Sequence, residues 1–301
     1  MPARMTKASL VKWRESRNAG ATGSTCCGQK IFLWGEKTYV MGIINVSPES
    51  FSGDGLASVD EAVVQAHRFA AEGADVIDIG GESTRPGTTP NSTAEAIKLE
   101  LQRVMPVLEK LAGTIEVPMS IDTYHCEVAR QALTTGAQMI NDTWGLKKDP
   151  RLANLAAERN VPIILMANHR ENPQRHIIPS VLANLKWSVE TALEAGVPWD
   201  NIIIDPGIGF GPTCDQNLEI IRRLDNLKVL GRPILLATSR KSIIGLTLNL
   251  PFDQRIEGTA ATIAIGIAKG ADMVRVHDVK EMVRVCRMSD AVVRGPVQRQ
   301  Q

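Results

Sequence analysis

The segment Asn201-Ile-Ile-Ile-Asp-Pro-Gly-Ile-Gly-Phe-Gly211 says most about the fold of this chain. Its run of isoleucines suits a strand buried on both faces, as in a parallel sheet covered by helices. The run breaks off into a carboxylate, a proline and three glycines, which suit a backbone that approaches a ligand closely. A second such break, Met273-Val-Arg-Val-His-Asp278, follows near the C-terminus. We therefore expect the core and a functional site to meet at strand ends.

The same alternation of short apolar runs and longer amphipathic stretches continues along the chain. The apolar runs predict strands at residues 39–44, 75–79, 117–121, 138–140, 162–166, 201–204, 233–237 and 273–276. Stretches with helical periodicity include residues 59–72, 93–111, 127–135, 182–195 and 254–269. Several of them end beside a glycine that suits a helix C-cap, namely Gly73, Gly136, Gly196 and Gly270.

Strand-then-helix units in this number, within about 260 residues, predict a closed (β/α)8 TIM barrel. A doubly wound open sheet is the alternative, because alternation alone does not show closure. No linker interrupts residues 38–295, so we expect one domain over residues 30–295, opening with a hairpin at residues 30–37. Residues 1–29 are expected to form a poorly ordered extension and residues 296–301 a C-terminal tail.

The composition excludes several classes of protein. The 301 residues carry 34 basic and 33 acidic side chains, so the balance predicts neither a nucleic acid nor an anionic membrane as partner. The longest apolar stretch, residues 259–268, is too short to cross a bilayer. Five cysteines without metal-like spacing indicate a reducing compartment, and we expect a cytoplasmic protein. The basic first 30 residues lack the apolar core of a secretory signal, although a transit-like peptide remains an alternative to a simple extension.

Polar residues follow nearly every predicted strand. In a barrel of this kind the site lies at the carboxyl ends of the strands. Each such residue alone is explained as a helix cap or a loop residue, but their convergence from many strands favours a site. The candidates at these ends are Asn45, Asp78, Asp122, Asn141, Asp142, Asn168, Asp205, Ser239, Lys241, Arg275 and His277.

These candidates fall into two groups by charge. Asp122, Asn141 and Asp205 offer the carboxylates and the amide that a flat ring with several N–H donors and a carbonyl requires. The other group, Lys241, Arg275 and His277, offers positive charge for an anion. The sequence thus predicts a heterocycle site beside an anion site.

Arg275 and His277 are the strongest part of the predicted anion site. They lie two residues apart on one face of the last strand, where such barrels often hold phosphate. The alternative is that Arg275 bridges to a neighbouring carboxylate and His277 caps a helix. Two loops, residues 45–55 and 80–87, are rich in Gly, Ser and Pro and suit mobile lids.

Ordered motifs across about residues 38–290 resemble the dihydropteroate synthases, of the pterin-binding group of barrels. The motifs are Met41-Gly-Ile-Ile-Asn-Val-Ser-Pro-Glu-Ser-Phe-Ser52, Asp78-Ile-Gly-Gly-Glu-Ser-Thr-Arg-Pro-Gly87, Ser120-Ile-Asp-Thr123, Ile140-Asn-Asp142, Asp205-Pro-Gly-Ile-Gly-Phe-Gly211, Ser239-Arg-Lys241 and Arg275-Val-His-Asp278. The resemblance implies an enzyme that condenses 6-hydroxymethyl-7,8-dihydropterin diphosphate with 4-aminobenzoate, giving dihydropteroate and pyrophosphate, with Mg2+ as cofactor and a homodimer as assembly.

The resemblance also implies roles for individual residues. Asp122, Asn141, Asp205 and Lys241 would hold the pterin, with Asp122, Asp205 and Lys241 as the catalytic residues, and Asn45 would ligate Mg2+. Asn45, Arg275 and His277 would bind the diphosphate, while Thr84, Arg85, Pro86, Phe210 and Ser239 would shape the aminobenzoate pocket. In the family the bond to pyrophosphate breaks first, and the aniline nitrogen captures a pterin methylene cation. Charged groups can stabilise such an ionising transition state without a protein nucleophile.

Two departures from the family pattern bear on activity. Pro212 stands where the family usually has Lys, and Met166-Ala-Asn-His169 stands where it usually has Met-His. They are the basis for one alternative, a weakly active pterin-binding paralogue. The other alternative is a methyltetrahydrofolate-binding methyltransferase, which would have no use for Arg275 and His277 or for the Ser-Thr-Arg-Pro loop.

Overall fold

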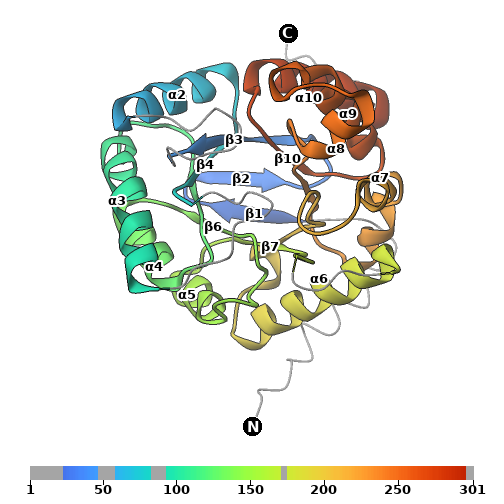
Figure 1. Ribbon diagram of the computed structural model, residues 1–301. Helices are drawn as coiled ribbons and strands as arrows, with labels where there is room; N and C mark the ends of the chain where they lie inside the picture. Colours follow the sequence, from blue (N-terminus) through green and yellow to red (C-terminus); the bar gives the residue numbers. More distant parts are fainter. Residues whose placement is uncertain (1–22, 47–57, 83–92, 171–174, 296–301) are drawn as a thin grey trace.

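The computed structural model describes residues 23–46, 58–82, 93–170 and 175–295. In this part of the chain eight parallel strands form one sheet, and helices surround it (Figure 1). The strands are β3 (Tyr39–Asn45), β4 (Val76–Gly80), β5 (Met119–Asp122), β6 (Met139–Asp142), β7 (Ile163–Met166), β8 (Ile202–Asp205), β9 (Leu235–Leu236) and β10 (Met273–Val276). All eight strands predicted from the sequence are present, with boundaries that differ from the prediction by at most two residues.

The sheet closes into a barrel. Its strand order is β8-β7-β6-β5-β4-β3-β10-β9, and the two ends of this order meet at a parallel bridge between Ile204 and Ile234. There the Ile204 N–H donates to the Pro233 carbonyl at 2.9 Å. A doubly wound open sheet would leave two edge strands, so the TIM barrel is confirmed.

Helices cover the outside of the barrel between successive strands. The described helices are α2 (Val59–Glu72), α3 (Ala94–Leu111), α4 (Cys126–Thr135), α5 (Arg151–Arg159), α6 (Ile177–Glu194), α7 (Cys214–Arg222), α8 (Ser242–Leu248), α9 (Ile256–Ala268) and α10 (Val279–Val293), with 3-10 turns η2 (Trp199–Asn201), η3 (Leu224–Leu230) and η4 (Phe252–Gln254). The predicted helix 59–72 matches α2, which starts after a Ser58 cap and ends at Gly73 with φ of 101°. The prediction 182–195 misses the start of α6, because Pro179 lies within the first turn, where a helix tolerates proline.

Alternate strand residues face the helices and the barrel interior. The outward set joins a large core with the helices, including Ile77, Ile140 and Ile204. The inward set forms a second core, which includes Val76, Met139, Ile164, Ile203, Leu235 and Met273. The two sets follow from the period of two along a strand, and they give every strand a defined inner face.

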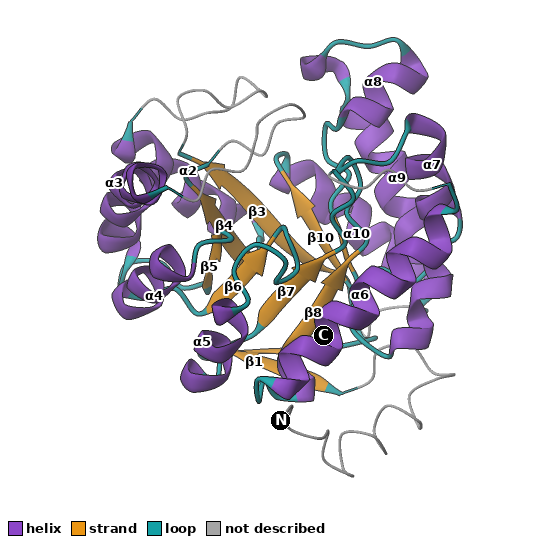
Figure 2. Ribbon diagram, turned by 60° about the horizontal axis from the view of Figure 1, so that its bottom comes forward, coloured by secondary structure: helices purple, strands orange, loops and turns teal. Residues whose placement is uncertain are grey.

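A hairpin covers one end of the inner core. Strands β1 (Ser24–Cys27) and β2 (Lys30–Leu33) pair antiparallel and lie across the barrel (Figures 1 and 2). Phe32 and Trp34 are buried with the inward strand residues. The hairpin starts at residue 24, whereas we placed it at residues 30–37 and gave residues 24–29 to the extension. The polar Ser-Thr-Cys-Cys run gave no strand signal, because its burial comes from contact with the barrel.

Asp290 of α10 binds Thr38, the residue that precedes β3. Its carboxylate accepts hydrogen bonds from the Thr38 N–H and hydroxyl, both at 2.7 Å, and Asp290 is 4% exposed. Asp290→Ala would leave the buried Thr38 N–H without its acceptor. We expect the free energy of unfolding to fall by about 2–3 kcal/mol, measured by urea denaturation. Asp60→Ala, which removes an exposed carboxylate, should change it by less than about 0.5 kcal/mol. Equal effects would contradict this role of Asp290.

Candidate active site

The inner face of the barrel changes from apolar to polar along the strands. On β4, for example, Val76 is followed two residues later by Asp78, and on β10 Met273 is followed by Arg275. Residues two apart face the same side of a strand, so the polar residues lie above the inner core at the carboxyl end. The other strands contribute Asp122, Asn141 and Asp205 in the same way.

Arg275 links the polar residues of three other strands. Its Nε donates to Asp78 Oδ2 at 2.6 Å and its Nη2 donates to Asp122 Oδ2 at 2.7 Å. Asn141 Nδ2 donates to the same Asp78 oxygen at 2.9 Å. The structure therefore brings together three of the predicted site residues, Asp122, Asn141 and Arg275. The same contacts confirm one part of the alternative interpretation, namely that Arg275 bridges to neighbouring carboxylates.

Asp78 is a member of this cluster that the sequence did not single out for a role. It is fully buried and joins Arg275 to Asn141. Its place on the inner face of β4 was a usable signal, because an acidic residue at an inward position needs a buried partner.

The ionisable groups at this end of the barrel have shifted pKa values. Burial raises the pKa of Asp122 to about 7, although the Arg275 guanidinium acts in the opposite direction. Burial also raises the pKa of Asp205, while Lys241 acts to lower it. Burial alone would lower the pKa of Arg275, but the charges of Asp78 and Asp122 raise it. Clustered groups with displaced pKa values are typical of functional sites.

The turn after β8 brings its backbone to the carboxyl end of the barrel. Asp205 Oδ1 accepts a hydrogen bond from the Gly207 N–H at 2.7 Å. Gly207, Gly209 and Gly211 have φ of 76°, 81° and 109°, as their sequence pattern suggested. A Cβ on Gly207 would lie 1.8 Å from the Ala167 carbonyl oxygen, so only glycine lets this turn pack against the end of β7. Pro212 follows the turn and directly precedes Thr213, the N-cap of α7.

Lys241 enters the site from the start of α8. Its Nζ donates to the Ile208 carbonyl and lies 4.7 Å from the centroid of the Phe210 ring. Burial lowers the pKa of Lys241 to about 8, whereas the Asp205 carboxylate acts to raise it. Lys241, Asp205 and Phe210 thus form a second cluster beside the first.

Ser239 and His277 meet at the ends of β9 and β10. The Ser239 hydroxyl lies 2.9 Å from His277 Nδ1 and accepts a hydrogen bond from the His277 N–H at 3.2 Å. The N-cap of α10 is Asp278, so His277 does not cap that helix. Asp278 pairs instead with Arg240, whose Nε donates to Asp278 Oδ2 at 2.9 Å.

Of the remaining residues with a predicted role, the structure describes Asn45 only. Asn45 ends β3 and is in register with Gly80 of β4, which places it at the same carboxyl end. Thr84, Arg85 and Pro86, together with most of the two predicted lids, lie outside the described residues.

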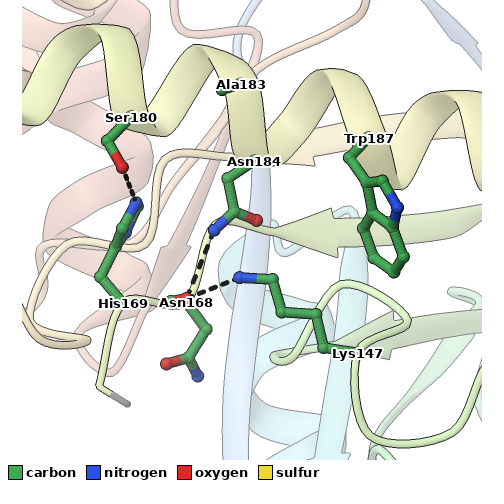
Figure 3. A pocket seen from close by; sticks show the side chains of 7 residues that line it. All are labelled: Lys147, Asn168, His169, Ser180, Ala183, Asn184 and Trp187. Carbon is green, nitrogen blue, oxygen red and sulfur yellow. Dashed lines mark hydrogen bonds between the residues drawn. The ribbon is translucent and has the colours of Figure 1, made fainter. Parts of the chain in front are cut away.

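His169 faces away from the clusters, toward α6. Its Nε2 lies 3.0 Å from the Ser180 hydroxyl, in a cleft of about 250 Å³ that Lys147, Asn184 and Trp187 also line (Figure 3). Burial lowers the pKa of His169, and the Lys147 charge lowers it further. The His169 side chain therefore lies in the cleft beside α6.

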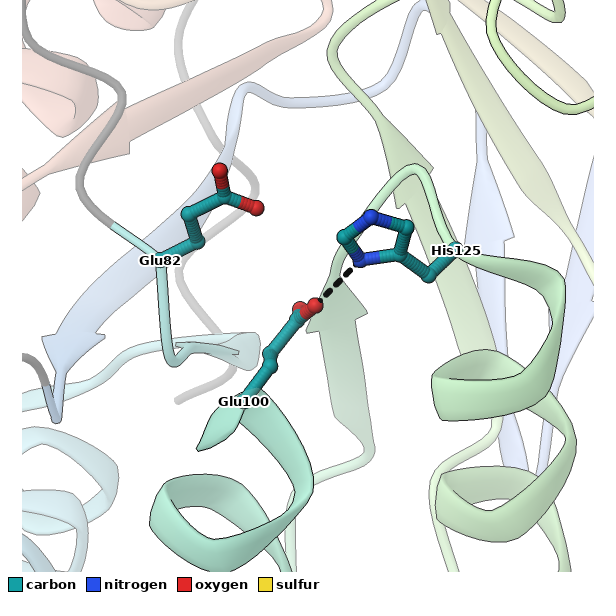
Figure 4. Close-up of side chains that lie close together, drawn as sticks. All are labelled: Glu82, Glu100 and His125. Carbon is teal, nitrogen blue, oxygen red and sulfur yellow. Dashed lines mark hydrogen bonds and ion pairs between the residues drawn. The ribbon is translucent and has the colours of Figure 1, made fainter. Parts of the chain in front are cut away.

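A separate group of ionisable residues, the buried Glu100 and His125 with the half-buried Glu82, lies near the end of β4. His125 Nδ1 is 2.6 Å from Glu100 Oε2 (Figure 4). The Tyr124 hydroxyl donates to Glu82 Oε1 at 2.8 Å. Potential ligand atoms of Glu82, Glu100 and His125 lie within 4.8 Å of one another. Burial raises the pKa of Glu82, and the Tyr124 hydrogen bond acts to lower it. The hydrogen bonds fix α3 and α4 beneath the end of β4, so this group is explained as a support of the site.

Comparison with known proteins agrees with this geometry. Residues 41–277 match the model of a family described as pterin binding enzyme. The dihydropteroate synthase of Bacillus subtilis is 50% identical over 259 residues, which are 86% of this chain and 90% of the relative. The chain therefore belongs to the pterin-binding enzymes, and within them to the dihydropteroate synthases.

Solved structures lead to the same family. A dihydropteroate synthase from Clostridium difficile, solved in the presence of pteroic acid, has a TM-score of 0.80 and 45% identity, with 87% of this chain and 98% of that chain covered. The Xanthomonas albilineans dihydropteroate synthase with 4-aminobenzoic acid has a TM-score of 0.82 and 37% identity, with coverage of 90% and 98%. This chain is thus a transferase that condenses 6-hydroxymethyl-7,8-dihydropterin diphosphate with 4-aminobenzoate. No helix in the described segments is long and apolar enough to span a membrane.

Proposed function

We propose that the two buried clusters hold the pterin ring between them. Asn141 and the carboxylates of Asp122 and Asp205 face the space inside the carboxyl end, where they can accept hydrogen bonds from the ring and its amino group. Lys241 lies beside Asp205 and can donate to an acceptor on the ring. Because these groups are buried, they discriminate strongly against a ring that leaves one of them unpaired.

The diphosphate of this substrate lies, in our proposal, toward Asn45, Arg275 and His277. Arg275 lies on the inner face of β10, directly above the inner core. It supplies positive charge there while it remains bonded to Asp78 and Asp122. His277 directly follows β10, and its Nδ1 lies 2.9 Å from the Ser239 hydroxyl. A departing pyrophosphate is thus stabilised by the fixed positive charge of Arg275.

Mg2+ is the cofactor we propose for this diphosphate. Mg2+ prefers oxygen ligands and usually combines one or two protein groups with waters and substrate phosphates. Asn45 offers an amide oxygen at the end of β3, in register with Gly80 of β4, which fits such an ion. When bound, the ion would neutralise charge on the leaving pyrophosphate.

The reaction we propose is an ionising displacement. The carboxylates of Asp122 and Asp205 favour positive charge that develops on the pterin methylene carbon, and they also orient the ring. The aniline nitrogen of 4-aminobenzoate then forms the new C–N bond and loses a proton. We assign Phe210 and Ser239, together with Thr84, Arg85 and Pro86, to the aminobenzoate pocket.

Exchange of labelled pyrophosphate tests this order of events. The enzyme and Mg2+ are incubated with the pterin diphosphate and labelled pyrophosphate, without aminobenzoate. If the bond to pyrophosphate breaks first, label enters the pterin diphosphate. A concerted displacement gives no exchange under these conditions, although dihydropteroate still forms once aminobenzoate is added. The observation that carries the proposal is the pair of buried clusters around Arg275 and Lys241.

The pH dependence of activity follows from two of these groups. Asp122, with a pKa raised to about 7, is charged above that pH, whereas Lys241, with a pKa lowered to about 8, is charged below it. We therefore expect kcat/KM for the pterin substrate to be highest between these values and to fall on both sides. Lys241→Arg, which keeps its charge to higher pH, should move the alkaline limb upward. An unchanged alkaline limb would show that Lys241 is not the group responsible.

We also propose a homodimer in the cytoplasm. The described cysteines are free thiols, the state that a reducing compartment maintains. Light scattering during gel filtration gives the mass of the assembly directly, and a monomeric mass would overturn the dimer without affecting the proposed chemistry.

A further inference from the structure

Glu82, Glu100 and His125 form a compact group beside the two clusters of the active site. Glu82 lies two residues after β4, Glu100 belongs to α3, and His125 is the N-cap of α4. Their side chains point toward one another (Figure 4), and their potential ligand atoms lie within 4.8 Å of one another. The group therefore connects three elements that are separate in the sequence.

The hydrogen bonds within this group leave one buried oxygen atom unexplained. Glu100 Oε2 lies 2.6 Å from His125 Nδ1, and Glu82 Oε1 accepts from the Tyr124 hydroxyl. Glu100 is 2% exposed, yet its Oε1 has no hydrogen-bond donor in the part of the chain that the structure describes. A buried carboxylate oxygen without a partner is costly. A cation held by the group would supply that partner.

The charges in the group favour a divalent cation. Burial raises the pKa of Glu82 and the Glu100 charge also raises it, because the two carboxylates repel each other. Arg103 acts to lower this pKa, but its Nη1 donates to the Gly81 carbonyl at 2.9 Å. An ion of charge +2 would neutralise both carboxylates and bind a neutral imidazole.

The donor types distinguish this group from the Mg2+ site proposed at Asn45. Mg2+ is bound mainly by oxygen atoms and keeps several waters. Two carboxylates and an imidazole suit Zn2+, whose bonds to His nitrogen and carboxylate oxygen are about 2.0–2.2 Å long. Two tetrahedral ligands at such distances lie about 3.3 Å apart. His125 Nδ1 and Glu100 Oε2, at 2.6 Å, must therefore separate slightly before both can bind one ion.

We propose that Glu82, Glu100 and His125 bind one Zn2+ ion. The ion gives Glu100 Oε1 a partner, and water fills the fourth tetrahedral position. Its role is structural, because it fixes Glu82, in the predicted loop at residues 80–87, to α3 and α4. The proposal does not depend on the mechanism of condensation, since it concerns a different metal and different residues.

Calorimetric titration of the full chain, without added histidines, tests the proposal. The protein is treated with a chelator, and Zn2+ is then added in the presence of millimolar Mg2+, which competes for sites made of oxygen atoms alone. We expect one Zn2+ to bind per chain. His125→Gln and Glu100→Gln should each weaken the affinity at least about 100-fold, more than the loss of an outer hydrogen bond at a metal site. Zn2+ should also raise the urea concentration at the midpoint of unfolding in the wild type but not in these variants.

Glu82→Gln keeps the test decisive if the two buried substitutions prevent folding. It leaves the pair of His125 and Glu100 intact, and it should weaken Zn2+ binding at least about 10-fold. The matched control is His67→Gln, which removes an exposed imidazole of α2 and should bind Zn2+ like the wild type.

The proposal is overturned if the wild type binds no Zn2+, or if His67→Gln weakens binding as much as Glu82→Gln does. It is also overturned if Glu82→Gln binds Zn2+ as tightly as the wild type, the result expected for an ion held by the exposed Cys26 thiol. None of these titrations contains a substrate, so a failure of the condensation reaction is distinguished from a failure of this assignment.

Discussion

Arg275→Met should lower the free energy of unfolding by about 3–5 kcal/mol, since it removes the partner of two buried carboxylates. Asp78 is fully buried and both carboxylates bond directly to the guanidinium. We also expect kcat/KM to fall by at least about 10³-fold, because positive charge disappears from the floor of the site. Denaturation in urea and pyrophosphate release measure the two effects.

A second substitution separates these two effects. Asp78→Asn in the Arg275→Met background removes one of the uncompensated charges and should restore part of the lost stability, yet activity should remain low. Lys269→Met, which breaks an exposed pair with Asp225, should change stability by less than about 0.5 kcal/mol. If Arg275→Met is as stable as the wild type, Arg275 does not hold the buried cluster together.

Asp205→Asn should reduce kcat/KM by about 10²- to 10³-fold with little change in stability. The amide oxygen can still accept the Gly207 N–H, so the turn is expected to survive. The substitution removes a charge that acts to raise the Lys241 pKa, and it replaces a pterin acceptor with a donor. Loss of one charged hydrogen bond in a buried site, about 3–4 kcal/mol, accounts for this magnitude.

The pH profile of Asp205→Asn provides a second readout. Without the Asp205 carboxylate, the pKa of Lys241 should be lower than its value of about 8 in the wild type. The alkaline limb of kcat/KM should therefore move to lower pH. Wild-type kinetics in this variant would show that neither the pterin nor Lys241 depends on Asp205.

The repeated fold could be predicted from the sequence because its signals are local. The isoleucines of residues 201–204 predict a strand. Gly207 and Gly211 predict a turn, because glycine tolerates the positive φ that both residues adopt. The inward polar positions follow from the period of two once a strand is recognised. These features need no knowledge of which strands are neighbours.

The missed features depend on contacts between distant segments. Asp78 and Arg275 are 197 positions apart in the chain, and only barrel closure shows that one bonds to the other. The segment after β7 packs on the turn after β8, where the His169 N–H donates to the Phe210 carbonyl. The hairpin strand at Ser24 is stabilised by its cover over the inner core, where Thr25 is buried. Periodicity within a segment carries none of this information.

The most direct test of the central claim is pyrophosphate release by the purified protein supplied with the dihydropterin diphosphate, Mg2+ and 4-aminobenzoate. We predict release at the same rate as dihydropteroate formation, dependent on aminobenzoate for net turnover and reduced by Asp205→Asn. Tight binding of the pterin diphosphate without formation of dihydropteroate would contradict the account and would identify a pterin-binding protein that lacks synthase activity.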